Sequence, residues 1–341
     1  MTNLTIALDA MGGDNGPPIT IPAALEVLAD NPQLTIIACG DKYQISPLLQ
    51  NASASLAARL QVIHCPQVVS MGEKPSQALR SKTQSSMRIV LDLLKENKAQ
   101  ACVSAGNTGA LLAMAYYVLK MLPGIKRPAL VTAIPGSLGH KTYVLDLGAN
   151  VACDEHILHQ FALMGSVLSE KNDLKNPRIG LLNVGEEEIK GSDTIKKTAR
   201  LLKEDKSLNY IGYVEGNDIF NDKADVIVCD GFVGNISMKA CEGLAKAVIE
   251  TIKSLARENW WSRLFAAIAL PMLKKLYRQM NPDQYNGASL LGLRGIVIKS
   301  HGNASKDAFK YALEEAINEI RHQVPEKIGN RIERALTDRS Q

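Results

Sequence analysis

Short apolar stretches alternate with longer amphipathic stretches along most of the chain. The short stretches are rich in β-branched residues, and several end in Gly, Asn or Asp, which is typical of buried strands followed by turns. The longer stretches place apolar residues at the spacing expected of helices. We expect strands at residues 4–8, 34–38, 101–103, 143–145, 179–182, 210–213, 226–228 and 295–298, and helices at residues 20–29, 77–97, 110–119, 155–168, 193–204 and 235–257.

This alternation predicts an α/β fold with a largely parallel sheet. Neither an internal repeat nor an obvious linker interrupts the sequence. We therefore expect a single α/β catalytic domain over residues 1–341, with an inserted amphipathic helical hairpin at about residues 250–281. A division into two domains is the alternative. Ligands of such sheets bind at the carboxyl ends of the strands, so the loops that follow the strands are where chemistry is expected.

Composition narrows the class of protein. The chain is 46% hydrophobic and 22% charged, which favours a folded globular protein over a disordered one. A net charge of +4 and an aromatic content of 5% argue against nucleic-acid binding. His156 and His159 lie on one predicted helix without an evident third ligand, so we expect neither a metal nor a cofactor. The absence of a GxSxG motif disfavours a serine hydrolase.

The strongest phosphate candidate is the loop after the strand at residues 101–103. It carries Ser104, Gly106, Asn107, Thr108 and Gly109 directly before a predicted helix. A helix N-terminus offers free amide hydrogens and a favourable dipole to an anion. The alternative is an ordinary helix cap made by Asn107 or Thr108.

Four further loops combine glycines with polar side chains at strand ends, although turn chemistry alone would explain each of them. Together they predict a wide cleft, rich in hydrogen-bond donors, for a small anion or a phosphorylated ligand. Lys82, Arg127 and His301 are expected to reach this cleft, with a solvated surface or a simple turn as the alternative. The residues of the four loops are Asp9, Gly12, Gly13 and Asp14, then Asp146 and Asn150, then Asn183 and Lys190, and finally Asp230 and Asn235.

Residues 253–280 differ in kind from the rest, because apolar and basic residues interleave there with Glu258 as the single acid. Pro271 is expected to break or turn the helix. The pattern fits an interfacial membrane helix, an acidic partner or a dimer contact, and a core-facing hairpin remains the alternative. The expected membrane or carrier-protein contacts are Trp260, Trp261, Arg263, Leu264, Phe265, Ile268, Lys274 and Lys275.

Six motifs occur in a characteristic order: DAMGGD, SAGNTGA, DLGAN, LLNVGEEEIKGS, DGFVGN and GLRGIVIKSHGNAS. In this respect the chain resembles the bacterial phosphate acyltransferases of phospholipid synthesis, the PlsX family, from residue 5 to about residue 320. The resemblance implies transfer of a long-chain acyl group from acyl carrier protein to inorganic phosphate. It also implies a Rossmann-like three-layer fold similar to phosphotransacetylase and isocitrate dehydrogenase.

The same resemblance implies a homodimer in the cytoplasm, attached peripherally to the cytoplasmic membrane, where a glycerol-3-phosphate acyltransferase would use the product. Phosphate is itself a nucleophile, so the enzyme has to hold it and stabilise the oxyanion. We assign the 104–109 loop to phosphate, Lys190 to charge stabilisation and Asn235 to oxyanion donation. The four aspartates would position these groups, because carboxylates repel phosphate. Three alternatives are a short-chain phosphotransacetylase using coenzyme A, a decarboxylating dehydrogenase and a non-catalytic membrane scaffold.

Overall fold

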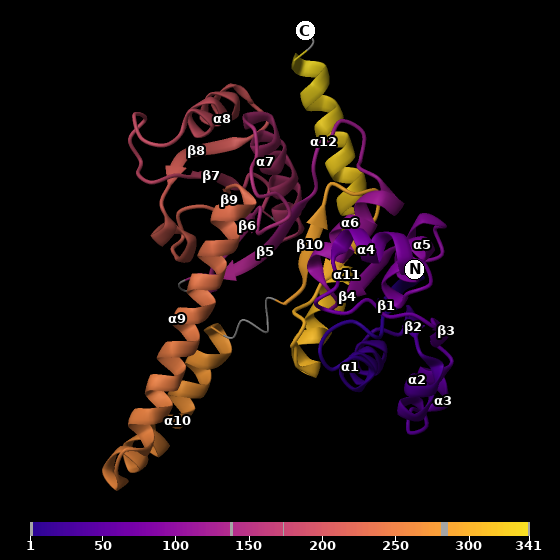
Figure 1. Ribbon diagram of the computed structural model, residues 1–341. Helices are drawn as coiled ribbons and strands as arrows, with labels where there is room; N and C mark the ends of the chain where they lie inside the picture. Colours follow the sequence, from indigo (N-terminus) through magenta and orange to yellow (C-terminus); the bar gives the residue numbers. More distant parts are fainter. Residues whose placement is uncertain (1–2, 137–138, 173, 281–285, 340–341) are drawn as a thin grey trace.

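The computed structural model describes residues 3–136, 139–172, 174–280 and 286–339, except for the side chains of Phe265 and of residues 172, 273–280, 338 and 339. Eleven strands form one sheet in the order β3-β2-β1-β4-β11-β10-β5-β6-β9-β7-β8 (Figure 1). The strands are β1 (Leu4–Asp9), β2 (Leu34–Gly40), β3 (Leu60–His64), β4 (Ala101–Ser104), β5 (Ala129–Pro135), β6 (Lys141–Leu145), β7 (Arg178–Leu182), β8 (Asn209–Val214), β9 (Val226–Val228), β10 (Ala288–Leu291) and β11 (Ile296–Lys299).

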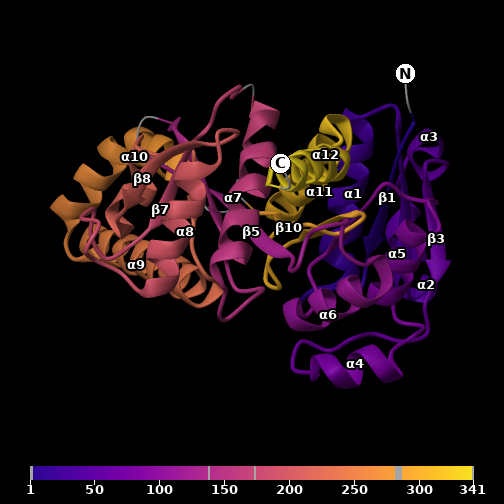
Figure 2. The same ribbon diagram turned by 90° about the horizontal axis from the view of Figure 1, so that it is seen from above.

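Helices cover both faces of the sheet, as expected of a three-layer α/β fold. Seen from above, β7, β8, α9 and α10 lie at one end of the molecule, and β3, α2 and α3 lie at the other (Figure 2). The helices are α1 (Pro17–Asp30), α2 (Lys42–Leu49), α3 (Ala54–Ala57), α4 (Pro75–Ser81), α5 (Ser86–Lys95), α6 (Thr108–Leu119), α7 (Glu155–Ser169), α8 (Asp193–Glu204), α9 (Gly231–Arg257), α10 (Trp260–Met280), α11 (Lys306–His322) and α12 (Val324–Arg339).

The core follows from the alternation of side chains along each buried strand. In β1, Ile6 and Leu8 pack with α1 and α11 on one face, whereas Ala7 faces the layer of α5 and α6. In β9, Val226 and Val228 pack against α7, and α12 packs on α7 in the same apolar cluster. Because both faces are buried, these strands read as continuous apolar runs, which is why they could be recognised from the sequence.

The direction of the strands changes in the middle of the sheet. The pairs β11–β10, β10–β5 and β5–β6 are antiparallel, whereas the pairs on either side are parallel. An odd number of reversals makes the β6-β9-β7-β8 block run opposite to the β3-β2-β1-β4-β11 block. The sheet is therefore largely parallel, as expected, but the carboxyl ends of its strands do not share one edge.

Two local expectations are wrong. The helix expected at residues 77–97 is divided into α4 and α5, because the Ser85 side chain caps α5 by accepting a hydrogen bond from the Arg88 amide. Pro271 lies inside α10 instead of turning the hairpin. The chain turns at Glu258 and Asn259, where the Asn259 side chain accepts a hydrogen bond from the Ser262 amide at 2.9 Å.

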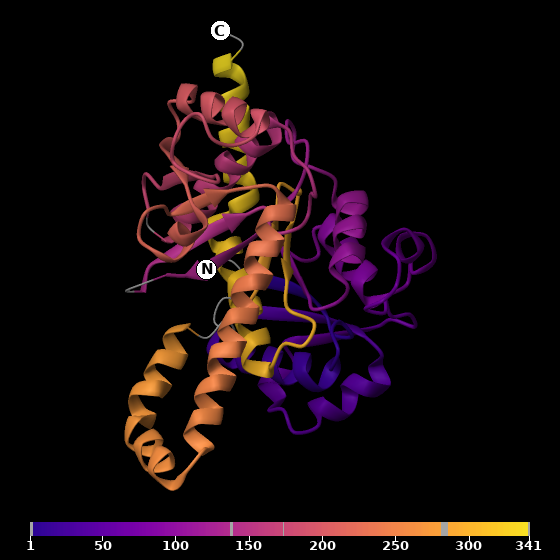
Figure 3. The same ribbon diagram turned by 60° about the vertical axis from the view of Figure 1, so that its left-hand side comes forward.

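The hairpin of α9 and α10, called the arm below, projects from the body of the molecule (Figures 1 and 3). It begins at Gly231, directly after β9, and so is longer than the expected segment at about residues 250–281. Gly231 and Gly234 are the buried residues of α9. The rest of α9 is exposed or half-buried.

Candidate active site

The loops after β1, β4 and β11 meet at one edge of the sheet, and residues 9–14, 104–109 and 299–302 are called the first loop cluster. Ser104 Oγ donates to Asp9 Oδ2 at 2.6 Å and accepts from the Gly106 amide at 3.1 Å. The Asp14 amide donates to the Gly302 carbonyl at 2.7 Å. A Cβ atom at Gly12 would lie 2.8 Å from the Gly106 nitrogen, so Gly12 is required for the close approach of two loops.

Asn107 does two structural jobs at the start of α6. Its Oδ1 accepts from the Ala110 amide at 3.0 Å, and its Nδ2 donates to the carbonyls of Met71 and Glu73 at 2.8 and 2.9 Å. Asn107 is therefore the helix cap, and its side chain is fully used. Among the described residues, the amides of Thr108 and Gly109 have no protein acceptor, so these first donors of α6 are available to an anion.

A buried lysine, which the sequence reasoning missed, belongs to the first loop cluster. Lys299 ends β11, is 8% exposed, and donates to the carbonyl oxygens of Ala105, at 3.4 Å, and Ser300. Burial lowers the pKa of Lys299 to about 8, with Asp9 and Asp14 opposing this shift and Lys239 adding to it. The available signal was a lysine directly at the end of an apolar strand, inside the motif GLRGIVIKSHGNAS.

Asp9 is the buried acid of this cluster. It is 1% exposed, and among the described residues its Oδ1 has no hydrogen-bond partner. Burial raises the pKa of Asp9, against the hydrogen bond from Ser104. The cluster thus holds two buried polar groups, the Lys299 ammonium and the Asp9 carboxyl, for which the described residues provide only some of the hydrogen-bond or charge partners.

The loops after β6 and β9 form a second loop cluster, residues 146–150 and 230–235. Buried Asp146 organises it by accepting hydrogen bonds from the amides of Leu130, Ala149 and Asn150 at 2.9, 3.0 and 2.6 Å. Asp230 caps α9 through the Val233 amide at 2.8 Å. The Asn150 carbonyl accepts from the Gly231 amide, which joins the two loops.

Asn235 is the fifth residue of α9, lies beside the rest of this second cluster and is exposed. A Cβ atom at Gly148 would lie 3.5 Å from that of Asn235, so the bare backbone of Gly148 passes close to this side chain. Gly234 packs against the Asp146 carbonyl oxygen and leaves no room for a Cβ atom. The position of Asn235 is therefore set by the Asp146 loop.

Lys190 lies in the loop after β7. It forms an ion pair with Glu187 at 2.8 Å, and its carbonyl accepts a hydrogen bond from Asn183. The hydrogen bond with Glu187 raises the pKa of Lys190. The other described hydrogen bonds of Asn183 go to Gly185 in the same loop and to the Val214 carbonyl of β8, so the described contacts of Lys190 and Asn183 do not reach the first loop cluster.

The expectation that all these loops line one cleft at one edge of the sheet is thus wrong. The loops form two clusters, because the two blocks of parallel strands that carry them run in opposite directions. Strands β5 and β10, which cause the reversal, were not predicted. Helix α9 connects the clusters. It begins in the second, and Lys239, one turn after Asn235, lies close enough to Lys299 of the first to lower its pKa.

The remaining candidates surround the two clusters. Thr108 is exposed at the start of α6, and exposed His301 follows Lys299, where its amide donates to Asn286 Oδ1 at 2.9 Å. Half-buried Lys82 lies between α4 and α5. Arg127 is exposed beside Pro128, whose carbonyl accepts from Asn150 Nδ2 at 2.7 Å.

The arm presents large apolar side chains to solvent. Trp260 and Trp261 are 62% and 54% exposed and stack on each other with ring centroids 3.7 Å apart. Arg263, Leu264 and Ile268 are also exposed, whereas Phe265, Lys274 and Lys275 fall outside the described side chains. None of the helices in the described ranges has the length and hydropathy needed to cross a bilayer.

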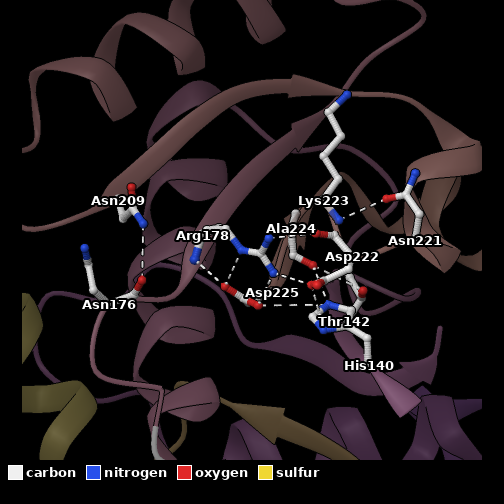
Figure 4. A network of polar contacts seen from close by, with 10 residues as sticks. All are labelled: His140, Thr142, Asn176, Arg178, Asn209, Asn221, Asp222, Lys223, Ala224 and Asp225. Atoms are coloured by element: carbon white, nitrogen blue, oxygen red, sulfur yellow. Dashed lines mark hydrogen bonds and ion pairs between the residues drawn. The ribbon is translucent and has the colours of Figure 1, made fainter. Parts of the chain in front are cut away.

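A polar cluster lies at the opposite, amino-terminal ends of β6, β7 and β9 (Figure 4). His140, Asp222 and Asp225 group three ligand atoms that could hold a metal ion. However, Arg178 pairs with Asp222 at 2.6 Å and with Asp225 at 2.9 Å, so the carboxylates already have a cation. These ion pairs link the amino-terminal ends of β6, β7 and β9. In the predicted histidine pair of α7, His159 bonds Asp205 at 2.7 Å.

The chain is similar to known proteins over nearly its full length. The family model described as fatty acid synthesis protein matches residues 4–327. Phosphate acyltransferases from Pseudoalteromonas atlantica and Colwellia psychrerythraea are each 54% identical to the chain, over 100% and 99% of both sequences respectively. The EutD phosphotransacetylase from Staphylococcus aureus has the same fold, with a TM-score of 0.61 at 16% identity over 94% of each chain. The expected Rossmann-like fold and the resemblance drawn from the six motifs are confirmed, and the chain belongs to the fatty acid synthesis protein family.

Proposed function

We propose that this protein transfers a long-chain acyl group from acyl carrier protein to inorganic phosphate, giving an acyl phosphate for phospholipid synthesis. The observation that carries the proposal is the similarity, over the full length, to relatives named phosphate acyltransferase. The likeness to a phosphotransacetylase supports the fold alone.

In the proposed reaction, a phosphate oxygen attacks the thioester carbonyl carbon. The new C–O bond forms, a tetrahedral oxyanion appears, and the C–S bond then breaks to release the carrier thiolate. Phosphate supplies the nucleophile, so the protein has to bind the anion and stabilise the oxyanion. The free amides of Thr108 and Gly109 support phosphate binding at the first loop cluster.

Asn235 and Lys190 are proposed to act on the carbonyl side. The side chain of Asn235 is exposed and lies against the Asp146 loop, and its amide group can donate a hydrogen bond to a developing oxyanion. Lys190 is 45% exposed in its ion pair with Glu187, and such surface pairs are weak, so an anionic substrate can take the place of Glu187. Asp9, Asp14, Asp146 and Asp230 are proposed to position loops.

The arm is proposed to serve the acyl group and its destination. Its exposed tryptophans and leucines, with Arg263 among them, suit contact with an anionic lipid surface or with acyl carrier protein. We also propose a homodimer and peripheral membrane attachment, which would bring the product to a membrane-bound glycerol-3-phosphate acyltransferase.

The reaction is tested with the purified chain, palmitoyl-carrier protein and phosphate, with acyl phosphate trapped as its hydroxamate. The proposal predicts a palmitoyl product and little product from acetyl-coenzyme A. The reverse preference would identify a short-chain phosphotransacetylase, and the absence of any acyl phosphate would favour a scaffold.

Attachment is tested by sedimentation with anionic vesicles. Leu264→Glu combined with Ile268→Glu places two charges on one face of α10 and should release the protein while circular dichroism stays unchanged. The matched control is Lys310→Glu on α11, away from the arm. Equal sedimentation of the wild type and the arm variant would refute the membrane role of this face.

A further inference from the structure

The first loop cluster contains a cation that the proposed mechanism has not used. Lys299 lies at the end of β11, which pairs with β4 so that Lys299 is the register partner of Ser104. The lysine therefore lies beside the start of the loop that leads into α6. Burying the ammonium group of Lys299 costs free energy unless a partner compensates its charge, so such a partner is expected.

The protein itself provides only part of that pairing. The ammonium donates to the carbonyls of Ala105 and Ser300, which carry no full charge. Among the described residues, no carboxylate lies within ion-pair distance of Lys299. Asp9 is the buried acid of the cluster, and burial raises its pKa, which favours the uncharged carboxyl.

The surroundings add further donors. Lys299 contacts the loop at Ala105, and the free amides of Thr108 and Gly109 follow in the same loop. Lys239 of α9, which pairs with Glu242 at 2.9 Å, is near enough to lower the pKa of Lys299. A buried ammonium group that lacks a carboxylate partner, together with unpaired amides at a helix N-terminus, forms a site that an anion would complete.

We propose that Lys299 is a phosphate-binding residue, whose ammonium holds a non-attacking oxygen of the phosphate that is bound by the α6 amides. This inference rests on the proposed function for its role in turnover. The anion-binding claim stands on the geometry alone. The ligand is inorganic phosphate or a phosphate-like oxyanion, because the site offers an ammonium group and backbone amides as donors.

The kinetic test compares Lys299→Gln with Lys171→Gln. Lys171 is the matched control, since its side chain is 5% exposed but pairs with Glu315 instead of lying at the loops. Loss of one charged hydrogen-bond donor should raise the KM for phosphate about 10- to 100-fold in Lys299→Gln. The KM for the acyl donor should stay within about twofold of wild type, and Lys171→Gln should change neither KM. A folded Lys299→Gln protein with an unchanged KM for phosphate would overturn the inference.

A pH profile of the wild type keeps the inference testable if Lys299→Gln does not fold. The charged groups that face Lys299 are Asp9 and Asp14 from β1 and its loop, and Lys239 from α9. Only protonated Lys299 attracts phosphate, so affinity should fall as the pH rises through about 8, with a limiting slope of about tenfold per pH unit. Affinity that stays constant between about pH 7 and pH 9.5 would contradict the role.

Phosphate binding can also be measured without turnover. At the same phosphate concentration, phosphate should raise the melting temperature of the wild type and of Lys171→Gln more than that of Lys299→Gln. If the wild type makes no acyl phosphate but is still stabilised by phosphate through Lys299, the proposed function fails and the site stands. If acyl phosphate forms normally and Lys299→Gln is stabilised as strongly as wild type, the site fails and the function stands.

Discussion

Replacing Asp146 by Asn tests whether one buried carboxylate holds the second loop cluster together. Its Oδ1 accepts from the amides of Leu130 and Ala149, and its Oδ2 accepts from the amide and the side-chain nitrogen of Asn150 at 2.6 and 2.9 Å. An asparagine keeps one acceptor oxygen and turns a donor toward the other pair. Two of the four hydrogen bonds are therefore lost.

The expected magnitude follows from those contacts. Each hydrogen bond to a charged acceptor contributes about 1.5–3 kcal/mol, so two lost bonds amount to about 3–6 kcal/mol. Burial raises the pKa of Asp146, which shows that the buried charge carries a desolvation cost, and removing that charge offsets part of the loss. We expect the free energy of unfolding to fall by about 3 kcal/mol, a large part of the stability of a typical protein.

The assay is urea denaturation followed by circular dichroism at pH 7. Asp154→Asn is the matched control, because Asp154 caps α7 with one hydrogen bond to the Ile157 amide and Asn caps helices equally well. The control should lose less than about 0.5 kcal/mol. A loss below about 1 kcal/mol in Asp146→Asn, with an unchanged denaturant slope, would refute the role given to this carboxylate.

Three other predictions concern separate parts of the molecule. Arg178→Met should cost about 2 kcal/mol at pH 7, because it leaves Asp225 buried without its cation. The hydrogen bonds from Arg178 lower the pKa of Asp222, and they outweigh burial to lower that of Asp225, so the stability they provide is present above about pH 4 and is lost as the pH falls below it. The free energies of unfolding of the wild type and of Arg178→Met should therefore converge as the pH falls. A difference that grows in acid would contradict this prediction. Asn235→Ala should lower turnover about 100-fold or more, whereas Ser237→Ala two positions along α9 should not, as measured by hydroxamate trapping. Gly12→Ala should cost about 1–3 kcal/mol, because its Cβ would meet Asp9 Oδ2 at 2.8 Å, whereas Gly72→Ala, which meets nothing within 4 Å, should leave the melting temperature nearly unchanged.

The parts of the fold that the sequence predicted are those with local signals. Strands β1 and β4 are apolar on both faces, and the 104–109 loop follows β4 as glycine, polar residues and a helix start. Strand β5 was missed because Pro128 and Pro135 bracket its apolar run and point to a loop. The reversal at β5 and β10 depends on long-range pairing, which leaves no periodic pattern in the chain.

The candidate site divides in the same way. Ser104, Asn107 and Asp230 were recognisable because a polar residue before a helix is a local feature. Lys299 was missed because its burial comes from β4 beside it and from the loops above, which lie far away in sequence. The separation of Lys190 from the first loop cluster was hidden for the same reason, since loop proximity follows from strand order.

The most direct measurement is the crystal structure of the protein soaked in inorganic phosphate. We predict one phosphate in the first loop cluster, within hydrogen-bond distance of the amides of Thr108 and Gly109 and of Lys299 Nζ. Phosphate bound away from these groups, with the 104–109 loop and Lys299 unoccupied at saturating concentration, would contradict it.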